Sequence, residues 1–65
     1  MRIVDLMYYF IDADFQKIEL YDLNSDKTVF EGHYGDMPAK YEDMEIASID
    51  NMYPKTDTLT INIAL

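Results

Sequence analysis

The last nine residues, DTLTINIAL, alternate polar and apolar side chains with the period of a β-strand. A period of two places successive side chains on opposite faces of a sheet, so one face of this segment is apolar and the other is polar. From Thr58 onward no proline, glycine or charged residue interrupts the pattern. The sequence therefore predicts a strand with one buried face, which consists of Leu59, Ile61, Ile63 and Leu65.

The same strand, residues 58–65, leads to a prediction about assembly. At the edge of a sheet it would present unpaired backbone groups without the prolines, bulges or charges that usually protect an edge. We therefore predict a homodimer or higher oligomer that uses the apolar residues of this strand as its interface. The alternative is that a neighbouring strand of the same chain covers it.

The chain is small and lacks the usual covalent supports. It has 65 residues and no cysteine, so we expect one domain, residues 1–65, without disulfides or cysteine-bound zinc. Hydrophobic residues make up 49% of the chain and include six tyrosines and three phenylalanines, which predicts a folded protein. A core of this size relies on good packing or on a partner subunit.

The charge of the chain is strongly acidic. Thirteen acidic residues against five basic ones give a formal net charge of −8. Such a surface repels phosphate backbones, because duplex binding depends on lysines and arginines that release counterions. It attracts basic surfaces, including the nucleic-acid groove of another protein. The alternative is that the acidic residues serve solubility alone.

The N-terminal segment does not have the pattern of a signal peptide. Asp5 interrupts its apolar stretch, and Asp12 and Asp14 stand where a cleavage site needs small residues. The stretch is also too short to span a bilayer. We therefore expect a soluble, cytoplasmic protein that has no membrane partner.

Apolar residues near the start of the chain recur at helical spacing. This spacing predicts an amphipathic helix over residues 2–12, with Asp5 near the positive end of its dipole. A strand is the alternative, because aromatic and β-branched residues also favour strands. The apolar stripe consists of Ile3, Val4, Leu6, Met7, Tyr8, Phe10 and Ile11.

The period changes to two after the predicted helix. A strand from Phe15, a hairpin loop over residues 24–27 and a return strand to Tyr34 are expected. Two closely spaced glycines, Gly32 and Gly35, then indicate a turn or a bulge.

The second half of the chain is expected to form a helical turn and then a second hairpin, whose last strand is the C-terminal one. Asp36 is expected to cap a short helical turn with Pro38 in its first turn, and a third strand is expected over residues 45–53, ended by Pro54. We therefore predict an α+β fold in which an N-terminal helix packs on a four-stranded antiparallel sheet made of two hairpins.

The first predicted loop contains the strongest candidates for chemistry. Asp22, Asn24 and Asp26 stand at alternate positions, as in the first part of a calcium-binding loop. The pattern then fails, because Lys27 replaces the required glycine and His33 replaces the bidentate glutamate, so a hairpin loop of good turn formers is favoured. A nuclease needs only one or two carboxylates to hold Mg²⁺, which makes Asp22 and Asp26 the candidate catalytic residues.

Other catalytic arrangements find little support. His33 is the one histidine of the chain, and there is no cysteine to pair with it. Neither Ser25 nor Ser48 lies in a nucleophile-elbow motif, and the segment EGHYGD lacks the lysine of a phosphate loop. Hydrolytic triads, nucleotide binding and thiol chemistry are therefore disfavoured.

Several tyrosines lie near predicted turns or strand ends, and so small a core cannot bury them all. These are Tyr21, Tyr34, Tyr41 and Tyr53. Aromatic residues exposed among acidic ones are common in protein-binding surfaces. We therefore predict a partner-binding face, which consists of Tyr41, Glu42, Asp43 and Glu45. The alternative is that the exposed tyrosines belong to an oligomer interface.

The pattern KIELYDLNSDKTVFEG, followed by GDMP, YEDMEIASIDNMYP and TLTINI, resembles small proteins of phages and integrative elements of gut Firmicutes over most of the chain. It is similar to a short anti-CRISPR group of gut Clostridia. The resemblance implies an oligomer with a four-stranded sheet related to a coactivator fold that binds single-stranded DNA. It also implies nicking of supercoiled DNA, so that a Cas9 effector engages its target less well. The chain departs from that group in its predicted N-terminal helix and in lacking a basic stripe.

Three functional hypotheses follow. The first is a phage-derived anti-CRISPR protein that antagonises a Cas9-class effector, with Mg²⁺ as its cofactor if it nicks supercoiled DNA. The second is a non-catalytic acidic module that binds a basic host protein, such as a nucleic-acid-binding protein. The third is a structural or regulatory homo-oligomer.

Overall fold

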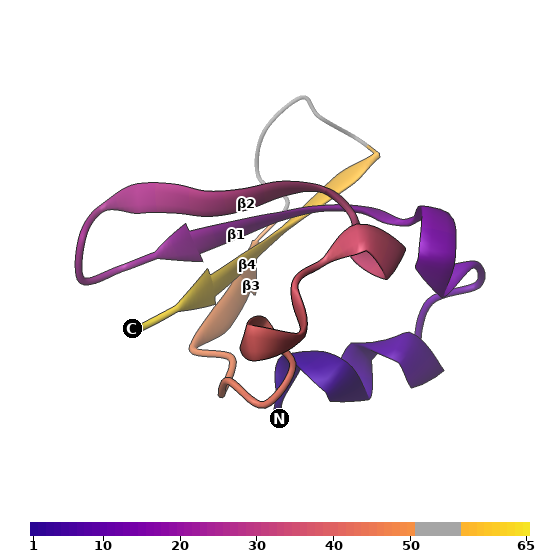
Figure 1. Ribbon diagram of the computed structural model, residues 1–65, viewed down its shortest axis with the longest axis horizontal. Coiled ribbons are helices and arrows are strands. Elements are labelled where there is room, and N and C mark those ends of the chain that lie inside the picture. The colour runs from indigo at the N-terminus through magenta and orange to yellow at the C-terminus, as the bar shows by residue number, and fades with distance from the viewer. Residues whose placement is uncertain (51–56) are drawn as a thin grey trace.

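Four strands and four short 3-10 helices make up the computed structural model, which describes residues 1–50 and 57–65 (Figure 1). The 3-10 helices carry the label η. In chain order the elements are η1 (Ile3–Tyr8), η2 (Ala13–Phe15), β1 (Lys17–Asp22), β2 (Lys27–His33), η3 (Tyr34–Asp36), η4 (Ala39–Tyr41), β3 (Ser48–Asp50) and β4 (Thr58–Ile63).

The strands form one mixed sheet in the order β2-β1-β4-β3 (Figure 1). β1 is antiparallel to β2 and parallel to β4, and β3 is antiparallel to β4. The prediction of a four-stranded sheet is confirmed, whereas the prediction that it is purely antiparallel is wrong. The two antiparallel pairs meet through the parallel pair β1–β4, which places the two most apolar strands at the centre, where backbone groups are bonded on both sides.

The position of β4 corrects the basis of the assembly prediction. β4 pairs with β1 along its whole length and with β3 over residues 60–62, so it lies inside the sheet and not at an edge. Ile61 and Ile63 are fully buried in the core of their own chain, and Leu59 is half-buried against that core. Leu65 is exposed. Self-association remains a prediction, but a strand edge at β4 does not support it.

The hairpin of β1 and β2 is confirmed, with its loop one residue earlier than predicted. The loop covers residues 23–26, and Asp26 adopts a φ of 59°, a left-handed conformation that aspartate tolerates well. The N–H of Asp26 donates to the carbonyl of Asp22 at 2.8 Å and closes the turn. The register shifts by one residue after Leu20, which leaves Val29 as the extra residue of a β-bulge.

The N-terminal segment is helical for less of its length than predicted. η1 is a six-residue 3-10 helix, so the prediction of an amphipathic α-helix over residues 2–12 is wrong. A 3-10 helix has three residues per turn, and only one side chain in three faces the sheet. Ile3 and Leu6 therefore reach the core, while Met7 and Tyr8 remain exposed.

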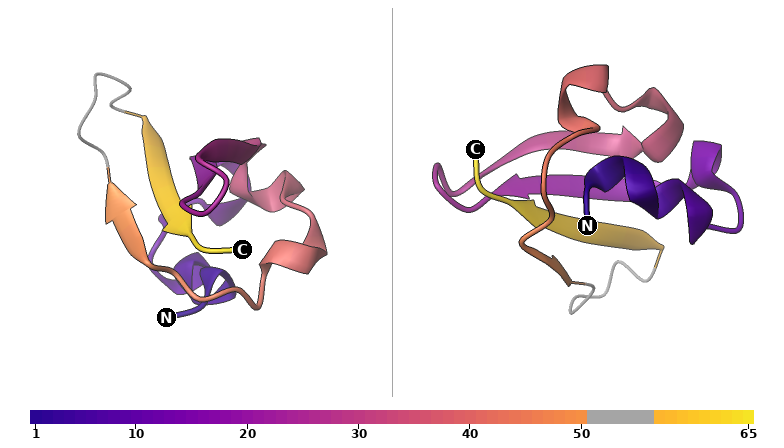
Figure 2. Two further views of the ribbon diagram at one scale, coloured as in Figure 1. Left: turned by 90° about the vertical axis from the view of Figure 1, so that its left-hand side faces the viewer. Right: turned by 90° about the horizontal axis from the view of Figure 1, so that it is seen from below.

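The core lies between η1 and one face of the sheet, and the right-hand view of Figure 2 shows η1 in front of β1 and β4. Phe10 packs edge-on against Tyr34 with ring centroids 5.2 Å apart, and the Tyr34 hydroxyl donates to the carbonyl of Ile3 at 2.9 Å. The buried apolar residues are Ile3, Leu6, Ile18, Leu20, Tyr41, Ile61 and Ile63.

The segment that follows η4 runs beside the N-terminus. The N–H of Ile3 donates to the carbonyl of Met44 at 2.9 Å, and the N–H of Ile46 donates to the carbonyl of Met1 at 2.8 Å. These bonds between distant segments fix the start of η1 and explain why tertiary contacts prevail there over helical propensity.

Two smaller predictions for the second half of the chain need correction. Asp36 ends η3 and does not cap a helix, because the N-cap of η4 is Pro38. β3 begins at Ser48, three residues later than the predicted strand, whose residues 51–53 lie outside the described residues, as does Pro54. None of the described helices is long and apolar enough to cross a membrane.

Candidate functional site

The face of the sheet opposite the core is polar, and none of its side chains is fully buried. Strand alternation places these side chains there, because Ile18, Leu20 and Ile61 point to the other side. We call this surface the open face. It consists of Lys17, Glu19, Tyr21, Thr28, Glu31, His33, Ser48, Asp50, Thr58, Thr60 and Asn62.

Three carboxylates lie in one row across the open face. The register pairs Glu19 with Glu31 on one side and with Thr60 on the other, and Thr60 pairs in turn with Asp50. The hydroxyls of Thr28 and Thr60 donate to the Glu19 carboxylate at 2.5 Å and 3.3 Å. We call Glu19, Glu31 and Asp50 the acidic row. It places negative charge on β2, β1 and β3, with Thr60 of β4 between Glu19 and Asp50, and two hydroxyl donors orient the carboxylate of Glu19.

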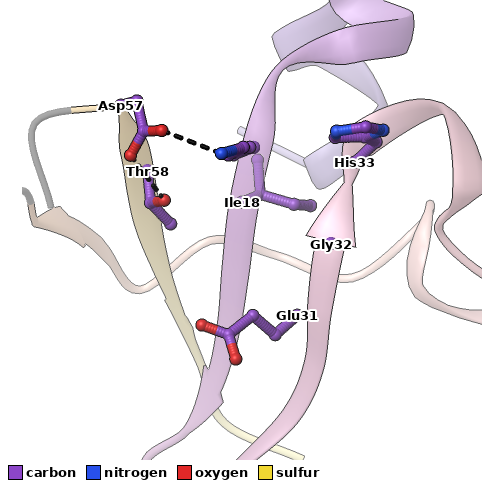
Figure 3. Close-up of a pocket in the computed structure, with 7 residues that line it drawn as sticks. Ile18, Glu31, Gly32, His33, Asp57 and Thr58 are labelled. Atoms are coloured by element: carbon purple, nitrogen blue, oxygen red, sulfur yellow. Dashed lines mark hydrogen bonds and ion pairs between the residues drawn. The ribbon is translucent and has the colours of Figure 1, made fainter.

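A pocket of about 380 Å³ opens at the end of the open face where β1 begins and β2 ends (Figure 3). Lys17 Nζ lies 3.0 Å from Asp57 Oδ2, and the Thr58 hydroxyl donates to Asp57 Oδ1 at 3.2 Å. The hydrogen bond and the charge of Lys17 lower the pKa of Asp57. The positive charge of Lys17 is therefore already balanced by the Asp57 carboxylate. The lining residues are Lys17, Ile18, Glu31, Gly32, His33, Asp57 and Thr58.

His33 does not form a catalytic pair in this pocket. Its ring meets Phe15 edge-on with centroids 5.9 Å apart, and its Nδ1 lies 3.9 Å from Asp36 Oδ2. The pocket hydroxyl, that of Thr58, donates to Asp57 and not to His33. His33 therefore has no hydroxyl nucleophile as a hydrogen-bond partner in this pocket.

Asp22, a predicted catalytic residue, is 4% exposed and holds two parts of the chain together. Its Oδ1 accepts the N–H groups of Asn24 at 3.1 Å and of Leu65 at 3.0 Å. Its Oδ2 accepts the N–H of Ser25 at 3.2 Å and the Ser25 hydroxyl at 2.6 Å. A carboxylate has about four acceptor sites, so these bonds fill its capacity and join the hairpin loop to Leu65, the second residue after β4. The N–H of Leu65 contributes most to lowering the pKa of Asp22.

Asp26, the second predicted catalytic residue, is exposed and accepts a hydrogen bond from the Tyr21 hydroxyl. Asp22 and Asp26 thus lie in the same loop but have different partners. Within residues 1–50 and 57–65, no group of three or more histidine, aspartate or glutamate side chains is arranged to hold a metal ion. Neither candidate therefore belongs to a three-residue set of metal ligands in the part of the chain that the structure describes.

The bonds of Asp22 predict a pH-dependent contribution to stability. Because folding lowers its pKa, ionised Asp22 stabilises the fold above the ordinary value of 3.8, and this contribution is lost as the pH falls through the lower folded value. We expect Asp22→Asn to lower the melting temperature by on the order of 5 °C at about pH 7, and by less at about pH 2. Circular dichroism melts at both pH values measure this.

Asp57→Asn provides the control for Asp22. The Asp57 pKa is also lowered, but its side chain is 62% exposed and its ion pair with Lys17 is screened by water. We expect a smaller change in melting temperature at neutral pH. A neutral-pH melt of Asp22→Asn that coincides with that of the wild type would contradict the bonding role of Asp22.

The predicted partner-binding face differs from expectation in two ways. Tyr41 is 7% exposed and belongs to the core, so it is not available as a contact residue. Glu42 is exposed, whereas Asp43 and Glu45 form ion pairs at 3.2 Å with Arg2 and with the N-terminal amino group. Part of the charge of this face is thus neutralised within the chain.

Sequence reasoning missed the acidic row and the exposure of large apolar side chains between Met7 and Phe15. The alternation in β1 and β2 predicted which side chains share a face, but it did not predict the strand register that aligns Glu19 with Glu31.

No family model matches the chain, and comparisons with curated proteins and with solved structures find no match either.

Proposed function

We propose that this protein is a non-catalytic antagonist of a nucleic-acid-binding protein, and that it binds the basic groove of its partner through the acidic row. The resemblance to anti-CRISPR proteins makes a Cas9-class effector the first partner to test. The observation that carries the proposal is a row of carboxylates across the whole width of a polar sheet face.

The distribution of charge over the whole molecule supports this proposal. Of the thirteen acidic residues, Asp22 alone is buried, so nearly all of the negative charge faces solvent at least in part. Arg2 and Lys17, two of the four basic residues that the structure describes, already form ion pairs. Such a surface attracts the lysines and arginines that a nucleic-acid-binding groove presents to phosphate.

Binding is favoured over nicking because of what surrounds the candidate catalytic residues. Asp22 is saturated by four hydrogen bonds from its own chain, and Asp26 accepts one from Tyr21. An acidic protein is also repelled by duplex DNA, whereas a basic protein groove attracts it.

The test measures target-DNA binding by a purified Cas9-class effector with its guide RNA, with and without this protein. We expect the wild type to reduce DNA binding, more strongly at low salt because exposed charges are screened at high salt. The variant Glu31→Gln/Asp50→Asn removes two charges of the acidic row, and we expect it to inhibit about tenfold less well. Fluorescence anisotropy of labelled target DNA provides the measurement.

The matched control is Glu42→Gln/Asp43→Asn, which removes the same charge from the predicted partner-binding face. We expect it to inhibit nearly as well as the wild type. Equal weakening by both double variants would show a response to net charge alone and would contradict a specific role for the acidic row.

A supercoiled plasmid separates binding from nicking in the same preparations. We expect the plasmid to stay supercoiled with excess protein and Mg²⁺. Conversion to open circles that is lost in an Asp22→Asn/Asp26→Asn variant would replace the binding proposal with the nicking hypothesis.

A further inference from the structure

Large apolar side chains lie exposed from the last two residues of η1 to the end of η2. Five such side chains, each at least 47% exposed, fall within residues 7–15. The rest of the described chain has four other exposed residues of this kind, at separate positions. We call the five residues the apolar segment, and they are Met7, Tyr8, Tyr9, Ile11 and Phe15.

The exposure follows from the local backbone. The apolar stripe of this stretch is wide enough to bury the face of an α-helix, but η1 is a 3-10 helix and turns only Ile3 and Leu6 into the core. Phe10 is the next residue to turn inward, where it packs on Tyr34. The remaining large side chains of the stretch therefore face solvent.

Tertiary contacts hold the backbone of the apolar segment in its middle and at its end. Phe10 packs against Tyr34 in its middle, and the ring of Phe15 meets His33 at its end. At Gly35, an added Cβ would come within 2.9 Å of the Cα and the carbonyl oxygen of Asp14, so η3 touches the backbone of η2. Such anchoring reduces the ordering entropy that a binding surface loses, which favours a docking site.

The charge around the apolar segment indicates the chemistry of the partner. Residues 3–16 contain three aspartates and no basic residue. Asp12 and Asp14 are exposed beside the apolar side chains, and Asp5 is half-buried. Two copies of this surface placed face to face would bring like charges together, whereas lysines and arginines around an apolar pocket would complement it.

We propose that the apolar segment is a docking site for a partner protein that presents apolar side chains flanked by lysine or arginine. The inference rests on the proposed function in assuming a basic protein partner, and it adds where that partner is anchored. Exposed aromatic and aliphatic side chains in a fixed arrangement provide the central contacts of many interfaces, and the surrounding aspartates orient the basic residues.

The test uses a labelled synthetic peptide of leucine and lysine whose leucines form one face of an α-helix. Fluorescence anisotropy measures its affinity for the full chain. We expect the wild type to bind it, and Ile11→Ser/Phe15→Ser to bind it at least about tenfold more weakly. Leu23→Ser/Ile49→Ser, which changes two exposed apolar residues elsewhere, is the matched control and should retain wild-type affinity.

Two further peptides separate apolar docking from charge. A peptide of the same composition with scattered leucines should bind at least about tenfold more weakly than the amphipathic one, and so should a version with glutamate in place of lysine. Equal affinity for either of them, or for the Ile11→Ser/Phe15→Ser variant, would overturn the proposal. Circular dichroism verifies that each variant is folded.

Two other occupants of the surface are also tested. A wild-type dimer in sedimentation velocity that Ile11→Ser/Phe15→Ser converts to a monomer would assign the surface to a second copy of the chain. Binding to neutral phosphatidylcholine vesicles that the same variant abolishes would assign it to lipid. Either result would overturn the proposal.

The two assays test the docking site and the proposed function separately. The expected peptide affinities without inhibition of the Cas9-class effector would contradict the proposed function and still support the docking site. Inhibition of the effector with equal peptide affinity for wild type and variant would contradict the docking site alone.

Discussion

Replacing Ile61 with alanine is expected to lower the free energy of unfolding by about 2–5 kcal/mol. Ile61 is fully buried in β4, where it lies in register with Leu20 of β1 and Ile49 of β3. Since a small domain is stable by only about 5–15 kcal/mol, this cavity would remove a large share of the total. Urea denaturation followed by circular dichroism measures the loss.

Ile49→Ala is the matched control for this prediction. Ile49 lies on the same face as Ile61 and is its direct register partner, but it belongs to the edge strand β3 and is 45% exposed. We expect it to cost less than about 1 kcal/mol, because much of its side chain is in water already. Equal losses for the two variants would contradict the central position of β4.

The periodicity of the sequence was sufficient to identify β1 and β4 as strands with one apolar face. The alternating pattern predicts that Ile18 and Leu20 of β1, and Ile61 and Ile63 of β4, face the core. All four side chains are buried. The turn formers between β1 and β2 predicted the hairpin to within one residue of its loop. These features depend on local sequence, which a single chain reveals well.

The order of the strands depends on contacts between distant segments and could not be predicted in the same way. A pattern of alternating residues shows which face of β4 is apolar, but not which strands lie beside it. The parallel pairing of β1 and β4 joins residues that are 41 positions apart, such as Lys17 and Thr58. The sequence therefore could not show whether β4 lies at the edge of the sheet, and the oligomer prediction depended on that position.

The helix near the N-terminus was mispredicted for a related reason. Its apolar spacing is compatible with an α-helix, and nothing local excludes that conformation. Backbone bonds to the segment around Met44 and Ile46 set its first turn, and they become visible only in the fold. The apolar segment is the consequence, because side chains that an α-helix would bury remain on the surface.

The candidate catalytic residues show how one residue type serves two purposes. Aspartate and asparagine at alternate positions suit both cation binding and the capture of backbone N–H groups in turns. The Asp22 carboxylate accepts N–H groups and a hydroxyl of its own chain, and its most influential donor, Leu65, is distant in sequence. Sequence alone could not distinguish these purposes.

Gly35→Ala is expected to destabilise the protein by about 1–3 kcal/mol. The new Cβ would lie within 2.9 Å of the Cα and the carbonyl oxygen of Asp14, and backbone atoms cannot move aside as a flexible side chain would. The reduced entropy of the unfolded chain would offset only about 0.4–1 kcal/mol of this cost. Relief of the clash requires η2 to move away from η3, so the position of Phe15 and affinity for the leucine–lysine peptide should change together with stability.

Asp36→Ala is the control for Gly35→Ala, because it changes the next residue of η3 at a side chain that is 80% exposed. We expect it to alter stability by less than about 0.5 kcal/mol and to leave peptide affinity at the wild-type value. Thermal melts and the peptide titration compare the two variants. Since the contact of Gly35 with Asp14 joins the fold to the docking surface, wild-type stability and affinity in Gly35→Ala would contradict both the packing of η2 on η3 and the anchoring of the apolar segment.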